Sequence, residues 1–309
     1  MINSCTVTAT GDQKTRRMLR HLKSQNPDAV VALTGCYPRP SPTPPTVCPA
    51  DVVTGARPGT AHRARGAGPR HRGGLSTSAR TSGSPSSRCA PSSFQRTRAF
   101  VKIEDGCERY CAYCIIPTAR GPVRSKAGRA ARRARGAREG GLPEAVLVGI
   151  NLSCYGKDLG LRLIDAVELA CSVEGIERVR LGSLEPELLT DGDIERMSRQ
   201  PKLCPQFHLS LQSGCDATLK RMNRHYDAVE YARIAGSLRR HFDNCAVTTD
   251  IMVGFPGEDE AEFAQSLAFA EEIALAKAHV FAYSAGPAPA PRTCPVRCPA
   301  PSRRPARPG

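Results

Sequence analysis

The sequence lacks any long apolar segment. None of its apolar runs approaches the roughly 20 residues that a membrane-spanning helix needs. The N-terminus, Met1–Cys5, also lacks the basic start and the apolar stretch of a secretory signal peptide. These absences exclude an integral membrane protein and predict a cytoplasmic protein with no membrane partner.

Acidic residues are scarce in two stretches that are rich in arginine. Residues 40–98 contain nine Arg and a single acid, Asp51, and residues 285–309 contain five Arg and no acid. Both are dominated by small residues and proline, so they have too few large apolar side chains to offset the entropy of ordering the chain. We therefore predict that both are disordered and offer no shaped surface to nucleic acid. A sharper hypothesis is that out-of-frame sequence of a GC-rich gene lies here, which resequencing would test.

The rest of the chain alternates between strand-like and helix-like segments. This alternation predicts a parallel sheet with crossover helices, and six units suit a partial barrel better than a closed eight-fold one. The active site of such a fold lies at the carboxyl ends of its strands. The predicted strands are Ala99–Glu104, Ala145–Ile150, Val179–Ser183, Phe207–Leu211, Ala246–Val253 and Ala278–Tyr283. The predicted helices are Leu161–Val173, Asp191–Arg199, Asp216–Met222, Ala228–Phe242 and Glu260–Leu275.

Two further segments belong to this pattern less clearly. Lys126 to Gly141 occupies the place of the first barrel helix, but it contains no large apolar residue, which weakens the prediction of a helix. Residues 1–39 resemble a fragment of an α/β layer, with a helix from Asp12 to Gln25 and a buried strand from Ala29 to Leu33. The predicted class is therefore α/β, with a partial six-unit barrel after a small α/β layer.

Three of the fourteen cysteines, Cys107, Cys111 and Cys114, lie within eight residues directly after the first barrel strand. In a cytoplasmic chain, cysteines indicate metal or redox chemistry before disulfides, because cytosolic thiols are kept reduced. Soft thiolates select iron–sulfur clusters, zinc or Cu(I), and three ligands leave one iron of a cubane open. A structural zinc knuckle is the alternative, although it needs a fourth ligand and usually pairs of cysteines.

The spacing Cys-x₃-Cys-x₂-Cys, with Tyr113 before the last cysteine, resembles the signature of radical-SAM enzymes. The resemblance implies a 4Fe-4S cluster whose open iron binds S-adenosylmethionine (SAM) and whose electron generates a 5′-deoxyadenosyl radical. The protein then supplies binding, orientation and exclusion of water. The resemblance also implies a SAM pocket formed by Tyr113 and by residues at the ends of later strands, namely Gly149, Asn151, Ser183, Glu185, Gln212, Asp250 and Gly254.

Further motifs resemble those of the radical-SAM tRNA methylthiotransferases. Asn3–Thr8 and Thr34–Tyr37 are similar to the N-terminal domain of that family, and Lys102–Ser125 and Lys220–Tyr226 are similar to its radical-SAM core. The residues of these motifs are most similar to those of the branch that acts on N6-threonylcarbamoyladenosine in tRNA. The branches acting on isopentenyladenosine and on a ribosomal-protein aspartate are less similar.

The resemblance implies a complete reaction, in which a methylthio group is added to C2 of N6-threonylcarbamoyladenosine beside the anticodon. One SAM makes the radical and another provides the methyl group. A second 4Fe-4S cluster, held in the family by three N-terminal cysteines, carries or donates the sulfur, and Cys5 and Cys36 match two of the three. The implied partners are tRNA and a reducing protein such as a flavodoxin or ferredoxin.

These observations predict four regions: residues 1–39, a truncated methylthiotransferase domain; 40–98, a disordered segment; 99–284, the radical-SAM barrel; and 285–309, a disordered tail without the family's small β-barrel (TRAM) domain. The expectation is a damaged copy whose barrel still binds a cluster and whose full activity is impaired. The alternatives are another branch of the family, a non-catalytic protein that binds zinc and RNA, and a pseudogene product with no stable fold.

Overall fold

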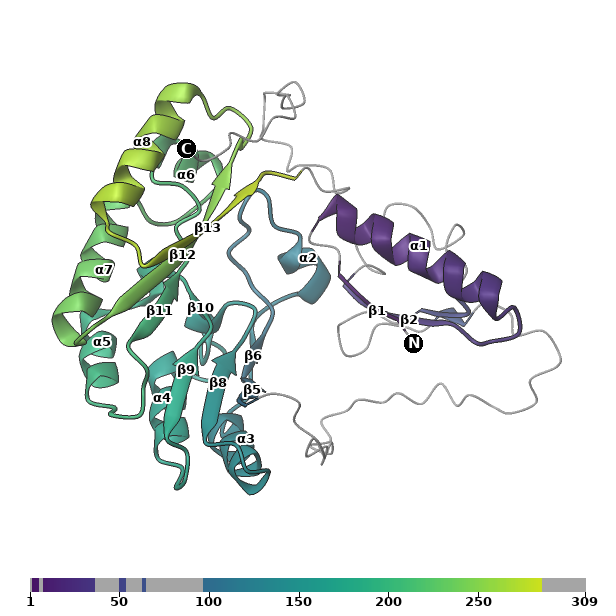
Figure 1. Ribbon diagram of the computed structural model, residues 1–309, viewed down its shortest axis with the longest axis horizontal. Coiled ribbons are helices and arrows are strands. Elements are labelled where there is room, and N and C mark those ends of the chain that lie inside the picture. The colour runs from purple at the N-terminus through teal and green to yellow at the C-terminus, as the bar shows by residue number, and fades with distance from the viewer. Residues whose placement is uncertain (1, 6–7, 37–49, 54–62, 65–96, 285–309) are drawn as a thin grey trace.

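The computed structural model describes residues 2–5, 8–36, 50–53, 63–64 and 97–284 (Figure 1). The predicted disorder of residues 285–309, and of most of 40–98, lies outside the described residues. No helix in the described part of the chain is both long and apolar enough to cross a membrane.

The N-terminal layer is a small sheet with one covering helix. Strand β1 (Ile2–Ser4), which was not predicted, leads through helix α1 (Ala9–Gln25) to the parallel strand β2 (Ala32–Gly35). The predicted helix is present, and the predicted strand begins and ends a few residues later than expected. The helix begins before Asp12 because the hydroxyl of Thr8 accepts a hydrogen bond from the amide of Gly11 at 3.1 Å and caps its first turn. Its buried Leu19 packs on Val31 and Leu33.

The sheet continues into the stretch that was predicted to be disordered. Strand β3 (Val52–Val53) pairs parallel with β2, and β4 (Arg63–Ala64) pairs antiparallel with β3. The carboxylate of Asp51, the single acid of residues 40–98, accepts a hydrogen bond from the amide of Val31 at 2.8 Å and pairs with Lys23 at 3.1 Å. The prediction of disorder is therefore wrong for these short pieces, because one carboxylate and strand pairing attach them to the layer.

The barrel contains all six predicted strand units, and all of them run parallel (Figure 1). Leu203 forms a parallel bridge to Val179, which links the first three strands to the next ones, and the third unit is divided at Gly182 into β9 and β10. In chain order the strands are β5 (Ala99–Lys102), β8 (Glu144–Val148), β9 (Arg178–Leu181), β10 (Ser183–Leu184), β11 (Gln206–Leu209), β12 (Ala246–Val253) and β13 (Lys277–Ala282).

The outer helices match the predicted ones to within a few residues at each end. They begin where side chains satisfy the free backbone amides of a first turn: Thr190, Asp227 and Asp259 each accept from the residue three positions on. Large apolar side chains from all of them except the last complete one core with the barrel strands, and the last contributes the partly buried Phe269. The helices are α4 (Leu163–Cys171), α5 (Asp191–Ser198), α6 (Asp216–Arg221), α7 (Ala228–His241) and α8 (Glu260–Glu272).

The weakly predicted first helix is present as α3 (Arg129–Glu139). Its inner face consists of alanines alone, Ala130, Ala131, Ala134 and Ala137, all of which are buried in the barrel core. Alanine is the best helix former, and its small side chain lets a helix lie close to the sheet. The absence of large apolar residues therefore does not prevent this helix from packing, which removes one argument for a chain without a stable fold.

Candidate active site

The three cysteines lie in the loop Cys107–Cys114, here called the cysteine loop, between strand β6 (Glu104–Asp105) and helix α2 (Ile116–Arg120). Backbone hydrogen bonds hold its two ends: the amide of Cys107 donates to Gly121 at 3.0 Å and that of Cys114 to Cys111 at 2.9 Å. Gly106 has a φ of 95°, and a Cβ there would lie 1.9 Å from the carbonyl oxygen of Pro122. Only glycine permits this entry into the loop.

The thiols of the loop influence one another. Burial is the main reason that the pKa of Cys107 is raised and that the pKa of Cys114 is raised to about 12, and the charges of the neighbouring thiolates add to both shifts. Within the described residues, no three His, Cys, Asp or Glu side chains converge closely enough to hold a single metal ion. The donor set nevertheless fits a cubane, because each thiolate of a cubane binds its own iron and the cluster removes the repulsion between thiolates.

A buried arginine links the cysteine loop to the third strand unit. Arg224 donates to the Cys111 sulfur at 3.2 Å and to the Tyr113 hydroxyl at 3.3 Å, and it forms an ion pair with Glu185. Its side chain is only 4% exposed. Tyr226 supports it, because its ring lies 4.9 Å from the guanidinium carbon and its hydroxyl accepts from the arginine Nε at 3.1 Å.

Two predicted pocket residues, Tyr113 and Glu185, thus meet through a residue that was not predicted to be part of the site. Arg224 stands inside the quoted Lys220–Tyr226 motif, so the signal was present in the sequence. Tyr113 also packs edge-to-face on Phe255 with ring centroids 6.3 Å apart, and its burial raises the pKa of its hydroxyl.

A second unpredicted group, Glu104, organises the turn after β8. Its fully buried carboxylate accepts hydrogen bonds from the amides of Ile150 and Asn151 at 2.7 and 2.9 Å. Burial raises its pKa to about 7, even though both hydrogen bonds oppose the shift. A Cβ at Gly149 would lie 2.5 Å from this carboxylate, so the glycine is needed for contact with Glu104. Gly149 is therefore required by the close approach of the Glu104 carboxylate, independently of any ligand that its backbone binds.

Asn151 connects that turn to the cysteine loop. It is only 6% exposed, and its amide nitrogen donates to the Cys107 sulfur at 3.7 Å. Its side-chain oxygen has no hydrogen-bond partner in the described part of the protein. A buried acceptor that lacks a donor is costly unless a ligand supplies one. Asn151 thus fits its predicted place in a cofactor pocket.

The other predicted pocket residues lie on β10 and β12 or in the segments that follow β11 and β12. Gln212 is buried with a left-handed φ of 66°, and its amide and carbonyl bond the backbone of β12 at Asp250 and Met252 at 2.8 Å each. Such a conformation in a non-glycine residue marks strain that clusters at functional sites. Asp250 faces His208 at 3.4 Å, Ser183 is exposed opposite His208 in the sheet register, and Gly254 borders open space at a φ of 71°.

The two N-terminal cysteines lie beside each other at the carboxyl ends of β1 and β2. The amide of Cys36 donates to the carbonyl of Ser4 at 3.0 Å, which places Cys36 next to Cys5. Cys5 is exposed and Cys36 is buried. Arg120, at the end of α2, donates from its Nε to the Cys36 sulfur at 3.1 Å, so this cysteine pair faces the helix that follows the cysteine loop (Figure 1).

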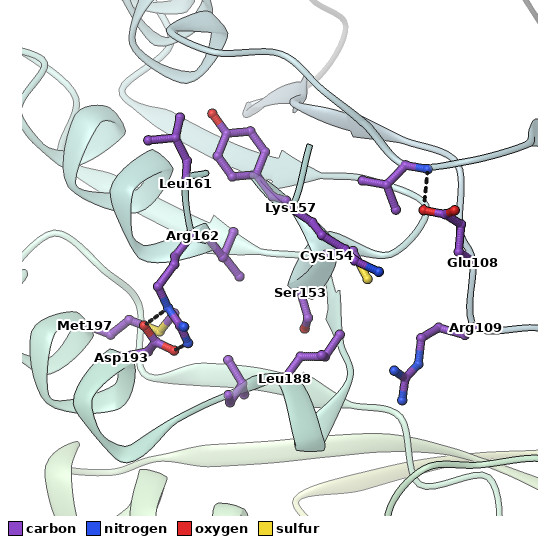
Figure 2. Close-up of a pocket in the computed structure, with 14 residues that line it drawn as sticks. Glu108, Arg109, Ser153, Cys154, Lys157, Leu161, Arg162, Leu188, Asp193 and Met197 are labelled. Carbon is purple, nitrogen blue, oxygen red and sulfur yellow. Dashed lines mark hydrogen bonds and ion pairs between the residues drawn. The ribbon is translucent and has the colours of Figure 1, made fainter. Parts of the chain in front are cut away.

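A separate cavity of about 280 Å³ lies behind the cysteine loop (Figure 2). It is lined by Glu108 and Arg109 of the loop, by Ser153 and Cys154 after β8, and by residues of α5 such as Met197. None of the predicted cofactor residues lines it. The close-up shows the ion pair between Arg162 and Asp193 at its edge.

Comparisons with known proteins agree with this geometry. Residues 101–270 match the Radical SAM superfamily, and residues 1–45 match a group described as Uncharacterized protein family UPF0004. The chain is 36% identical over 298 residues to the threonylcarbamoyladenosine tRNA methylthiotransferase MtaB of Thermotoga maritima, covering 93% of this chain and 66% of that protein. It is 31% identical to the protein of the same name from Aquifex aeolicus, covering 93% of this chain and 71% of that protein.

Solved structures also resemble part of this chain. The radical SAM methyltransferase TsrM of Kitasatospora setae aligns with a TM-score of 0.51 at 10% identity, covering 60% of this chain and 36% of that chain. At this identity the likeness concerns the fold, and it confirms the α/β radical-SAM barrel. The chain belongs to the Radical SAM superfamily and, within it, to the methylthiotransferase family that the Thermotoga and Aquifex proteins represent. It spans about two thirds of the length of those relatives.

Proposed function

We propose that this chain is a radical-SAM methylthiotransferase that modifies C2 of N6-threonylcarbamoyladenosine in tRNA. The observation that carries the proposal is the link from Cys111 through Arg224 to Glu185, at the carboxyl ends of parallel barrel strands. It joins the cysteine loop to the pocket predicted for SAM. Identity to the two relatives over 93% of the chain supports the substrate.

In this proposal the cysteine loop holds the radical cluster through Cys107, Cys111 and Cys114. A 4Fe-4S cluster with SAM bound supplies the electron and the 5′-deoxyadenosyl group needed to remove a hydrogen atom from an unactivated carbon. The protein's own contribution is to position the cysteine sulfurs and to exclude water from them. The Arg224 guanidinium donates to the sulfur of Cys111, and the Asn151 amide donates to that of Cys107. Hydrogen bonds to cluster sulfurs and low solvent exposure tune the reduction potential.

Charged and strained groups of the barrel form the remaining pocket. Glu185 offers a carboxylate whose charge is balanced by Arg224, and Asp250 offers a second one within β12. Ser183, Gln212 and Gly254 complete the set that we assign to the ribose, methionyl and adenine parts of SAM. Tyr113, packed on Phe255, closes the apolar side and excludes water.

We further propose that Cys5 and Cys36 bind the second, sulfur-supplying cluster. Their adjacent placement at two strand ends supports this role, as does the hydrogen bond from Arg120 to Cys36. A cubane with three protein thiolates needs one ligand more than these two residues provide. The proposed partners are tRNA and a reducing protein such as a flavodoxin or ferredoxin, acting in the cytoplasm.

Anaerobic iron–sulfur reconstitution tests the two sites separately. About eight irons per chain are expected if both clusters form and about four if only the barrel cluster does. An electron paramagnetic resonance signal that shifts on addition of SAM would support the barrel assignment. Bound zinc, or no cluster, would overturn it in favour of a non-catalytic remnant.

The reaction itself is tested with tRNA that carries N6-threonylcarbamoyladenosine. Mass spectrometry of the digested tRNA should show a gain of one methylthio group, which is absent when the substrate tRNA carries isopentenyladenosine instead. Product only from the isopentenyladenosine tRNA would move the chain to that branch of the family.

A further inference from the structure

The outer surface of helix α3 is rich in arginine and is here called the arginine face. It consists of the exposed Arg132, Arg135 and Arg138 together with the half-buried Arg129 and Arg133. The opposite side of the helix is the buried alanine stripe, which fixes the orientation of these arginines away from the core. Across residues 120–138 the chain has seven Arg, one Lys and no acid. This charge lies on a helix that is packed against the barrel core.

The arginines of this face repel one another. Residues three and four apart on a helix are neighbours, so Arg129 lies near both Arg132 and Arg133, and like charges at that spacing destabilise a helix. In agreement, burial lowers the pKa of Arg129 and the charges of Arg133 and Arg132 lower it further. None of the ion pairs among residues 97–284 involves an arginine of α3. The one acid of the helix, Glu139, is its last residue and forms no ion pair with these arginines among the described residues, so the arginine face keeps a net positive charge.

The basic surface continues from α3 to the cysteine sites. Lys126, one turn before the helix, has a pKa lowered by burial and then by the nearby Arg129 and Lys102. Arg120 and Arg124 follow, sharing the carboxylate of Asp105 at 3.6 and 3.5 Å. Arg120 in turn contacts Cys36. A row of cations thus runs along α3 to the junction of the N-terminal layer and the barrel.

The last helix of the barrel has the opposite charge. Helix α8 and its cap carry Asp259, Glu260, Glu262, Glu271 and Glu272, with no basic residue between them. Figure 1 places α8 and α3 at different ends of the barrel. A polyanion is therefore attracted to the α3 side and repelled from the α8 side, which orients its approach.

We propose that the arginine face binds the phosphate backbone of the RNA substrate. The inference rests on the proposed function for the identity of the RNA and adds the surface that docks it. Guanidinium groups pair with phosphates in a bidentate manner, and each such contact releases condensed counterions. RNA lying along α3 reaches the Cys36–Arg120 junction, since Arg124 and Lys126 continue the row of cations.

The experiment measures binding of a fluorescein-labelled tRNA transcript to the full chain over a range of salt concentrations. The triple variant Arg132→Gln, Arg135→Gln, Arg138→Gln removes three exposed charges, and glutamine keeps a high helix propensity. We expect affinity to fall by about 10- to 100-fold at low salt, and the slope of log K against log salt to fall by about 2 to 3.

Two matched variants keep the test specific. The first is a control that removes three exposed arginines from the side of α5 and α7, by the substitutions Arg199→Gln, Arg233→Gln and Arg240→Gln. It should leave the affinity for tRNA and the slope of log K against log salt unchanged. Replacing the three α3 arginines by lysine should retain most of the slope. Equal losses in the α3 and control variants, or no loss in either, would overturn the inference. Because the assay uses unmodified transcript and needs no cluster, its result is independent of whether methylthiolation is observed.

Discussion

Two groups of side chains in this protein have the same composition, a cysteine, an arginine and a carboxylate, but lie in different surroundings. In the barrel, Arg224 lies between the sulfur of Cys111 and the carboxylate of Glu185. At the junction with the N-terminal layer, Arg120 lies between the sulfur of Cys36 and the carboxylate of Asp105. In each case one guanidinium orients a thiol and takes its counter-charge from a carboxylate.

The difference between the two groups is burial. The side chain of Arg224 is 4% exposed and that of Arg120 is 25% exposed. Breaking a buried ion pair leaves an uncompensated charge in a low dielectric, whereas a half-buried pair is partly screened by water. Asp105 also keeps Lys102 and Arg124 as partners if Arg120 is removed. The group around Arg224 is therefore suited to keep its geometry within the barrel alone. The group around Arg120 is suited to a site where the N-terminal layer and the barrel meet.

The largest effect should follow removal of the barrel thiols. Cys111→Ala is expected to abolish cluster assembly in the barrel, with a loss of about four irons and of all product, because two thiolates hold a cubane poorly. Cys36→Ala should spare that cluster and its SAM-dependent resonance signal. Iron analysis with resonance spectra distinguishes them, and loss of the barrel signal in the Cys36 variant would break the distinction between the groups.

The arginines should differ in their effect on stability. Arg224→Gln is expected to lower the free energy of unfolding by about 3–5 kcal/mol, because it leaves the Glu185 carboxylate buried and unpaired. Arg120→Gln should cost about 1 kcal/mol or less. Denaturant titration of both variants, with Arg224→Lys as the charge-keeping control, measures the difference. Equal costs would show that burial does not separate the two groups.

Glu104 gives the barrel site a pH dependence. Its folded-state pKa of about 7 exceeds the ordinary value of 4.5, so the folded protein binds this proton more tightly than the unfolded chain does. Stability from this group is complete below pH 4.5 and is lost as the pH rises to about 7. Glu104→Gln should remove this loss of stability at high pH. The melting temperature of the variant should therefore exceed that of the parent at pH 8 and be about equal to it at pH 5. A parallel pH profile in parent and variant would contradict this.

The smallest effect concerns the junction thiol. Arg120→Ala is expected to expose Cys36 and to speed its alkylation by iodoacetamide severalfold, because the side chain that covers it is gone. Cys5, which is already exposed, serves as the internal control and should react at an unchanged rate. Peptide mass spectrometry resolves the two sites. An unchanged rate at Cys36 would mean that the sheet, and not Arg120, buries this thiol.

The sequence predicted the barrel well, because strand and helix periodicities are local properties of the chain. All six strand units are present, and the helix ends follow from capping residues such as Thr190 and Asp227. It predicted α3 poorly, since a stripe of four alanines carries little hydrophobic signal, although alanine packs a helix closely against a sheet. It missed the attachment of residues 50–53, which depends on the contact of Asp51 with Val31, 20 residues earlier.

The sequence by itself determined the chemistry of this protein. The spacing of Cys107, Cys111 and Cys114 predicts an iron–sulfur cluster, because the softness of thiolates and the radical-SAM spacing are properties of the sequence alone. Only the tertiary structure decided which other side chains contact the cysteines and the turn beside them. Arg224 reaches Cys111 across 113 positions, and Glu104 reaches Asn151 across 47, because the barrel brings the ends of separate strands together. Burial then fixes the charges and proton affinities that the sequence leaves open.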